Sequence, residues 1–136
     1  MSSISLDDIR KTAEHLANKI NAPENLLPTY GRSRDGAHTH IEIDSSDSLH
    51  FVVVERGEEL ERKTTKDLNE LLYWIFDSIT FSMSVDFELK HRIRTKDSRR
   101  IMFAKQEELL DVLDILWQQK QHEEHKRIIK ENPFVD

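Results

Sequence analysis

The chain contains no cysteine and has little glycine, proline or aromatic side chain. Without cysteine it has no disulfide, no thiolate nucleophile and no zinc site built on cysteine ligands, which agrees with a reducing cytoplasm. It has only three glycines, and neither Gly31 nor Gly36 belongs to a phosphate-binding motif. The sequence therefore excludes a P-loop and a dinucleotide-binding fingerprint.

Long hydrophobic runs are also missing. The first eleven residues, MSSISLDDIRK, lack the apolar core of a signal peptide, and no run approaches the length of a membrane span. Hydrophobic residues make up 37% of the chain and charged residues 34%, which is typical of a well-solvated folded domain. We therefore expect one cytoplasmic domain over residues 1–136, with no membrane as a partner.

Apolar residues at helical spacing predict a first helix over residues 5–20 and a long helix over residues 64–93. Ser5 and Asp8 have the spacing of a capping box at the first start, and Thr64 and Asp67 have it at the second. The long helix has the largest apolar stripe of the chain, so the other elements are expected to bury themselves against it. Tyr73 lies off that stripe, so a second side of this helix could be covered by another copy of the chain in a homodimer.

A last helix is expected from about residue 97 to residue 131, ended by the Asn132-Pro133 pair. Its buried side is predicted to include Val112, Leu116 and Trp117. Residues 118–127 (QQKQHEEHKR) are entirely polar. We expect this end to be exposed to solvent.

Between the first two helices the apolar pattern changes to alternation. Residues 38–44, 49–56 and 58–63 each predict a short strand, separated by short turns. Consecutive strands joined in this way favour an antiparallel meander. The predicted fold class is α+β, with an N-terminal helix, a three-stranded antiparallel meander and two long C-terminal helices packed on the sheet.

The net charge of −6 is unevenly distributed. Residues 42–62 contain seven acidic residues and two arginines, whereas residues 90–105 contain seven basic residues and one aspartate. The acidic strand region suggests a basic partner, because complementary fields raise the rate and specificity of association. The basic segment could bind nucleic acid, but the overall acidity and its single aromatic residue, Phe103, disfavour this.

His38, His40 and Glu42 alternate along a predicted strand and so share one face. This His-x-His arrangement could ligate zinc, and His122 and His125 form a second pair at helical spacing. The chain has no His-Glu-x-x-His motif and no serine in a nucleophile elbow. Histidine on a half-exposed strand face is also the ordinary outcome, so a metal-dependent hydrolase remains only an alternative.

Several stretches resemble one bacterial family. They are LPTYG at residues 27–31, HIE at 40–42, FVVVERG at 51–57, LNELLYWIF at 68–76, ELKHRI at 88–93 and NPF at 132–134. On these residues the chain resembles the immunity protein 63 family of bacterial polymorphic toxin systems. The resemblance implies an α+β fold and a non-enzymatic protein that binds a toxin encoded nearby. It supplies no catalytic residue and no cofactor.

We therefore predict an immunity protein that neutralises a cognate toxin domain by covering its active site with an acidic surface. The candidate toxin-binding residues come from the strand region and the loop before it: Tyr30, Arg32, Glu42, Asp44, Glu55, Arg56, Glu58, Glu59 and Glu61. Tyr30 also suits a core position. The alternatives are a metal-dependent hydrolase that uses His38, His40 and Glu42, and a nucleic-acid-binding regulator that uses residues 90–105.

Overall fold

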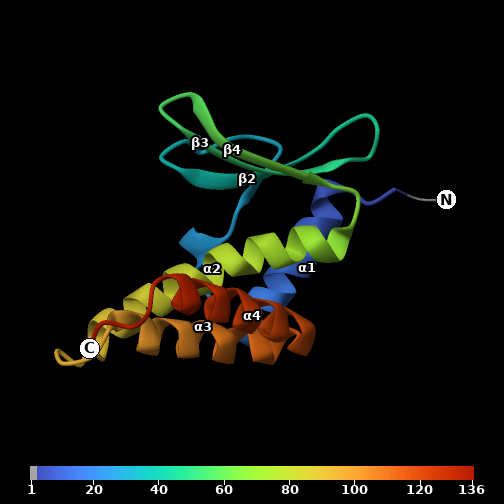
Figure 1. The fold of residues 1–136 in the computed structure, drawn as a ribbon. Coiled ribbons are helices and arrows are strands. Elements are labelled where there is room, and N and C mark those ends of the chain that lie inside the picture. Colours follow the sequence, from blue (N-terminus) through green and yellow to red (C-terminus); the bar gives the residue numbers. More distant parts are fainter. Residues whose placement is uncertain (1–2) are drawn as a thin grey trace. The chain divides into compact units, whose positions relative to one another are not determined.

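The computed structural model describes residues 3–136 and has the predicted α+β class (Figure 1). Its elements follow in the order α1 (Leu6–Lys19), a short 3-10 helix η1 (Glu24–Leu26), β1 (Thr29–Tyr30), β2 (His38–Ile43), β3 (Leu49–Glu55), β4 (Glu58–Thr65), α2 (Leu68–Lys90), α3 (Ser98–Leu113) and α4 (Ile115–Glu131). The chain divides into two compact units, with the boundary between Ile75 and Phe76, inside α2. That residues 1–136 form a single domain remains a prediction.

The sheet has four strands in the order β1-β2-β3-β4, so the prediction of three strands was incomplete. The additional strand, β1, pairs in parallel with β2, with Thr29 beside His40 and Tyr30 beside Ile41. The sheet is therefore mixed. A two-residue strand is too short to show alternation, and Pro28 and Gly31 on either side of it are typical of a loop.

The inner face of the sheet contributes to the core of the first unit. Ile41, Leu49 and Phe51 are almost fully buried, as are Ile9 and Ala13 of α1. The capping box predicted for α1 is present, because the side chains of its first turn bond the free backbone N–H groups at distances of 3.0 Å. Local capping and the apolar stripe together account for this helix.

Helix α2 begins later than predicted, and the capping box expected for Thr64 and Asp67 was wrong. Thr64 belongs to β4, while the Thr65 hydroxyl accepts from the Asp67 N–H at 3.0 Å. The Asp67 carboxylate in turn accepts from the Asn69 N–H at 2.9 Å. The chain therefore passes from strand to helix through a short turn held by its own side chains.

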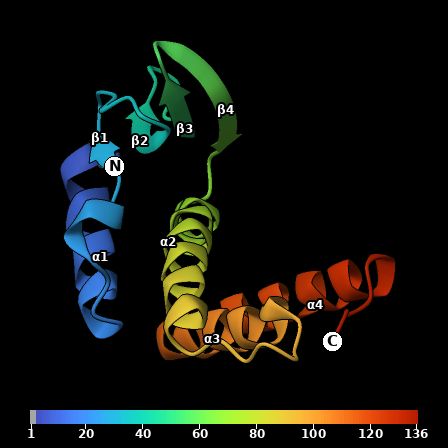
Figure 2. The same cartoon turned by 90° about the vertical axis from the view of Figure 1, so that its left-hand side faces the viewer.

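The segment predicted to form one last helix forms two helices, α3 and α4. The chain therefore has three helices after the sheet, and the prediction of two was wrong. Asp114 has an extended backbone (φ −167°, ψ 117°) and separates α3 from α4. Its carboxylate accepts from the Leu116 N–H at 2.8 Å and so caps α4. Helices α3 and α4 lie side by side as an antiparallel pair (Figure 2).

The turn at Asp114 changes which side chains are buried. Val112 and Leu116 were predicted to be buried, but they lie at the turn and are 55% and 68% exposed. Conversely, Gln121 and His125 belong to the segment predicted to be exposed, and both are buried. The polar stripe of α4 faces α3, and so the second unit contains a polar network in its interior.

Candidate functional site

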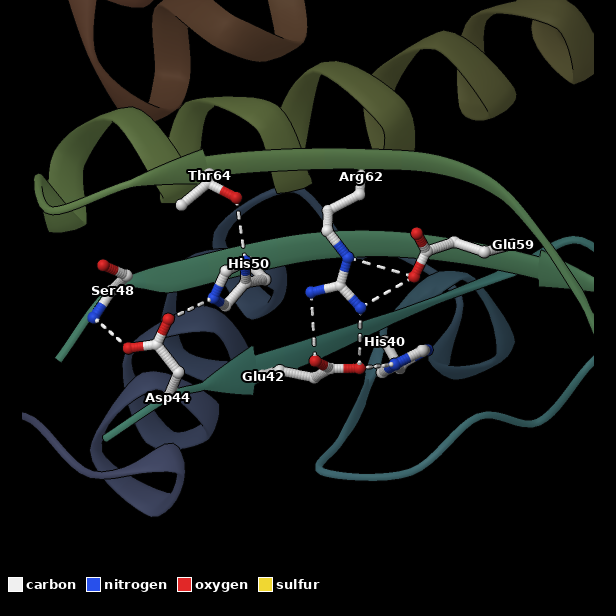
Figure 3. A network of polar contacts seen from close by, with 8 residues as sticks. All are labelled: His40, Glu42, Asp44, Ser48, His50, Glu59, Arg62 and Thr64. Atoms are coloured by element: carbon white, nitrogen blue, oxygen red, sulfur yellow. Dashed lines mark hydrogen bonds and ion pairs between the residues drawn. The ribbon is translucent and has the colours of Figure 1, made fainter. Parts of the chain in front are cut away.

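An arginine on β4 organises the outer face of the sheet (Figure 3). The Arg62 guanidinium donates to Glu59 at 2.7 Å and to Glu42 on β2 at 3.1 Å. Glu42 also accepts from the His40 Nε2–H at 2.6 Å. Pairing with His40 and Arg62 lowers the pKa of Glu42, and pairing with Arg62 lowers the pKa of Glu59.

The same sheet face contains a second histidine network (Figure 3). His50 Nε2 donates to the Asp44 carboxylate at 2.8 Å, and its Nδ1 lies 2.8 Å from the Thr64 hydroxyl. Asp44 also accepts from the N–H groups of Ser46 and Ser48 at 2.9 and 3.0 Å. The His50 hydrogen bond is the main reason that the pKa of Asp44 is lowered.

These contacts show that some predicted toxin-binding acids already have partners within the chain. Glu42, Asp44 and Glu59 each take part in an ion pair or histidine contact on the outer face. A toxin that used them would have to compete with Arg62, His40 or His50. They therefore form a structured polar surface with little free negative charge.

A β-bulge separates the remaining acids from this surface. Val53 pairs with Glu61 and Val54 pairs with Glu59, so Leu60 has no partner in the register. Because neighbouring strand residues point to opposite faces, Glu59 and Glu61 lie on opposite faces of the sheet. The predicted acidic patch is thus divided between two faces.

We call Glu55, Glu58 and Glu61 the acidic hairpin. Glu55 and Glu58 stand directly opposite each other across the turn, and all three side chains are exposed. Within residues 3–136, none of the three forms an ion pair. Like charges in directly opposed strand positions repel each other, so this arrangement reduces the stability of the hairpin.

The turn and the bulge complete the hairpin's surface. Arg56 and Gly57 both have positive φ, 53° and 74°, which is the backbone of a tight two-residue hairpin turn. The bulged Leu60 is 57% exposed between acidic neighbours. Sequence reasoning missed Leu60, because a single leucine in a polar strand gives no periodic signal.

The loop before β2 contributes in a different way. The Tyr30 hydroxyl is buried without a hydrogen-bond partner among the described residues, and burial raises the pKa of Tyr30 to about 12. Arg32 is exposed, and its carbonyl accepts from the Thr29 hydroxyl at 2.6 Å. Tyr30 of β1 is therefore half-buried with a buried hydroxyl, whereas Arg32 and the rest of the loop that follows are accessible.

The two histidine clusters do not form a recognisable metal site in the part of the chain that the structure describes. No three histidine, aspartate or glutamate side chains among residues 3–136 are grouped to hold a metal ion. His40 is paired with Glu42, and burial lowers the pKa of His38. His122 and His125 both contact Glu107 through Nδ1, at 2.8 and 2.7 Å.

Most of the basic segment at residues 90–105 is neutralised locally. Five of its seven cations have a carboxylate partner; they are Lys90, Arg92, Arg99, Arg100 and Lys105, paired with Asp86, Glu88, Asp97, Asp136 and Glu108. Arg99 and Arg100 also hold the C-terminal tail, and the Arg100 guanidinium lies 4.0 Å from the ring centre of Phe134. These arginines therefore stabilise the second unit.

Comparison with models of known protein families identifies the family of this chain. The family model described as Immunity protein 63 matches residues 45–127, which include β3, β4 and all of α2 and α3. Neither the curated proteins nor the solved structures gave a match. None of the helices within residues 3–136 combines the length and apolar composition needed to cross a membrane.

Proposed function

Because the chain belongs to the immunity protein 63 family, we propose that it binds a cognate toxin domain and blocks its active site with the acidic hairpin. The protein acts by binding, without catalysis or a cofactor. Glu55, Glu58 and Glu61 make the first contact, with Leu60 as an apolar anchor among them.

The observation that carries this proposal is the unpaired charge of the hairpin. Glu55 opposes Glu58 without a counter-ion within residues 3–136, although a lysine at either position would remove the repulsion. Natural proteins commonly break a local stability rule at functional sites. A basic partner surface would supply the missing counter-charge and convert a destabilising feature of the free protein into affinity.

The charge also indicates the kind of toxin surface that fits. Three carboxylates on one short hairpin match a basic cleft, such as the cleft in which a nuclease binds phosphates. The exposed Leu60 could enter a pocket in that cleft, and buried apolar anchors supply much of the affinity of protein interfaces. Of the remaining predicted contacts, Arg56 lies in the hairpin turn and Arg32 lies in the loop between β1 and β2, and both are exposed.

Neutralising the hairpin tests the proposal. In the variant Glu58→Gln/Glu61→Gln we expect affinity for the toxin domain encoded by the neighbouring gene to fall about tenfold or more. The stability of the free protein should be unchanged or slightly higher, because the repulsion between Glu55 and Glu58 is removed. Calorimetric titration gives the affinity and urea unfolding gives the stability.

A matched control separates the hairpin from net charge. Glu24→Gln/Asp111→Asn changes the charge by the same amount at two exposed acids that lie outside the sheet. This control should bind and protect cells like the unaltered chain. If the hairpin variant also binds and protects normally, the acidic hairpin is not the toxin-binding surface.

A further inference from the structure

The second unit contains a groove of about 670 Å³ between α3, α4 and the C-terminal tail. Phe103, Ile129 and Phe134 give it an apolar lining, and Glu107 and His122 lie at its polar part. Its volume is in the range of sites that hold an apolar group with a few polar contacts. The groove therefore has space for a bulky side chain from outside the chain.

The groove has a firm wall. The rings of Phe103 and His125 stack with their centres 3.9 Å apart and their planes inclined by 3°. His125 is 5% exposed, and Glu107 holds both His125 and His122. Because these side chains fix one another, this wall needs little rearrangement to receive a ligand.

One charge at the groove remains uncompensated. Glu107 is paired with two histidines, Lys126 lies 3.6 Å from Glu123, and Arg127 pairs with acids of its own helix. Lys130 lines the groove and is exposed, and it has no ion pair with any residue from 3 to 136. The site thus combines an apolar lining with an available cation.

We infer that this groove binds a bulky apolar side chain of the toxin that is flanked by a carboxylate, with the carboxylate paired to Lys130. The inference rests on the proposed function, because it takes the toxin as the partner. It adds a second contact whose chemistry is opposite to that of the acidic hairpin. The hairpin requires a basic surface, whereas the groove requires an apolar anchor beside an acidic residue.

Size favours this occupant over a second copy of the chain lying with its acidic hairpin in the groove, although that hairpin would also bring carboxylates to Lys130. The hairpin offers Leu60 as its one large exposed apolar side chain, whose volume is small beside a groove of 670 Å³. An aromatic side chain of the toxin would bury more apolar surface against Phe103 and Ile129. A neighbouring carboxylate would add a charge-assisted hydrogen bond from Lys130.

Two matched lysines test the charge. Lys130 lies in the last turn of α4 and Lys19 lies in the last turn of α1. Both lysines are exposed, and neither forms an ion pair among the residues described. We expect Lys130→Glu to weaken binding of the neighbouring-gene toxin domain about tenfold. Lys19→Glu should stay within about twofold of the unaltered chain. Titration calorimetry with the full chain measures both.

Ile129→Ala tests the apolar contact. Ile129 is only half-buried, so the variant should fold, which circular dichroism and urea unfolding will verify. We expect dissociation of the toxin to become about five- to tenfold faster, with little change in the association rate. Normal affinity in both Ile129→Ala and Lys130→Glu would overturn the inference.

The outcomes separate this inference from the proposed function. If the unaltered chain forms no complex with the toxin, both are overturned. If a complex forms and only the hairpin variant weakens it, the groove inference alone is overturned. Native mass spectrometry tests for the other occupants. If it detects a dimer or a retained small molecule, and if that species is lost in Ile129→Ala, the groove is assigned to that occupant and the toxin contact is overturned.

Discussion

Carboxylates take part in polar networks in both units, but the Arg62 ion pairs of the sheet are exposed, whereas the network of the helical pair is buried. On the sheet, Arg62 and Glu59 pair at an exposed surface. In the helical pair, His125 lies between α3 and α4 with Gln106 and Glu107 as partners, and it is 5% exposed. Water can replace the partners of the exposed group but not those of the buried group. The sheet network is therefore open to rearrangement by a partner, whereas the helical network fixes which helix faces meet.

The largest effect should follow from a change at Gln106, which joins three helices. Its Nε2 donates to the Asp77 carbonyl at 3.1 Å and to the Thr80 hydroxyl at 3.3 Å, and its Oε1 lies 3.0 Å from His125 Nε2. Gln106→Ala removes these bonds and leaves buried polar atoms without partners. We expect the free energy of unfolding to fall by about 3 kcal/mol.

Urea unfolding measures this loss, and Gln119→Ala provides the control on an exposed helical glutamine. The control should change the free energy of unfolding by less than about 0.5 kcal/mol. A Gln106→Ala protein as stable as the control would mean that the buried network does not hold the helices together. The contrast between the two units would then be lost.

The next effect concerns binding kinetics, in which the two surfaces should differ. Glu58→Gln/Glu61→Gln should slow toxin association about tenfold at low salt, because long-range attraction steers the encounter. Its association rate should also become less sensitive to salt. Ile129→Ala should act on dissociation at every salt concentration, because apolar burial is not screened. Stopped-flow mixing over a salt series measures both rates, and equal salt slopes in the two variants would contradict this division.

Local signals in the sequence predicted much of the fold. The Ser5 and Asp8 capping box lies at the start of α1, and β2, β3 and β4 begin at the residues where alternation begins. These features depend on neighbours within a few residues, so the sequence contains them directly. The family was also recognised, because the stretches that resembled it include residues inside the matched range 45–127.

The errors occurred where tertiary contacts override the local pattern. Asp114 interrupts an otherwise continuous helical pattern, because folding α4 back on α3 buries Gln121 and His125. Polar residues at a helix interface look like solvent-exposed residues in the sequence, although the four-residue spacing of Trp117, Gln121 and His125 is a stripe. The bulge at Leu60 likewise follows from strand pairing, so alternation along the sequence could not reveal that it divides Glu59 and Glu61 between two faces.

A smaller effect should follow from removal of the sheet's central cation. Arg62→Met leaves Glu42 and Glu59 without their shared cation. The side chains of Arg62, Glu42 and Glu59 are 35%, 36% and 45% exposed, so water compensates for much of the loss. We expect the free energy of unfolding to fall by about 0.5–1 kcal/mol, less than for Gln106→Ala. Arg32→Met is the control, since Arg32 is exposed and forms no ion pair within residues 3–136. A loss of about 3 kcal/mol for Arg62→Met would show that the exposed network resembles the buried one.

The smallest effect is the contribution of Arg62 to stability in acid. Its hydrogen bonds, after that of His40, lower the pKa of Glu42 below the ordinary value of 4.5. The folded state therefore binds fewer protons than the unfolded state as the carboxylate titrates. This stabilisation is complete above the unfolded pKa and is lost as pH falls through the folded pKa. Asp136, whose pKa is lowered to about 2 by Arg100, acts in the same direction.

We expect the stability of the unaltered chain to decline below about pH 4.5. The stability of the Arg62→Met variant should decline less steeply, because Glu42 and Glu59 then titrate closer to their ordinary range. Urea unfolding at successive pH values measures the two slopes. Identical slopes would show that the pairing in the sheet network exerts no net effect on folding, and Arg62 would then only neutralise Glu42 and Glu59 at the surface.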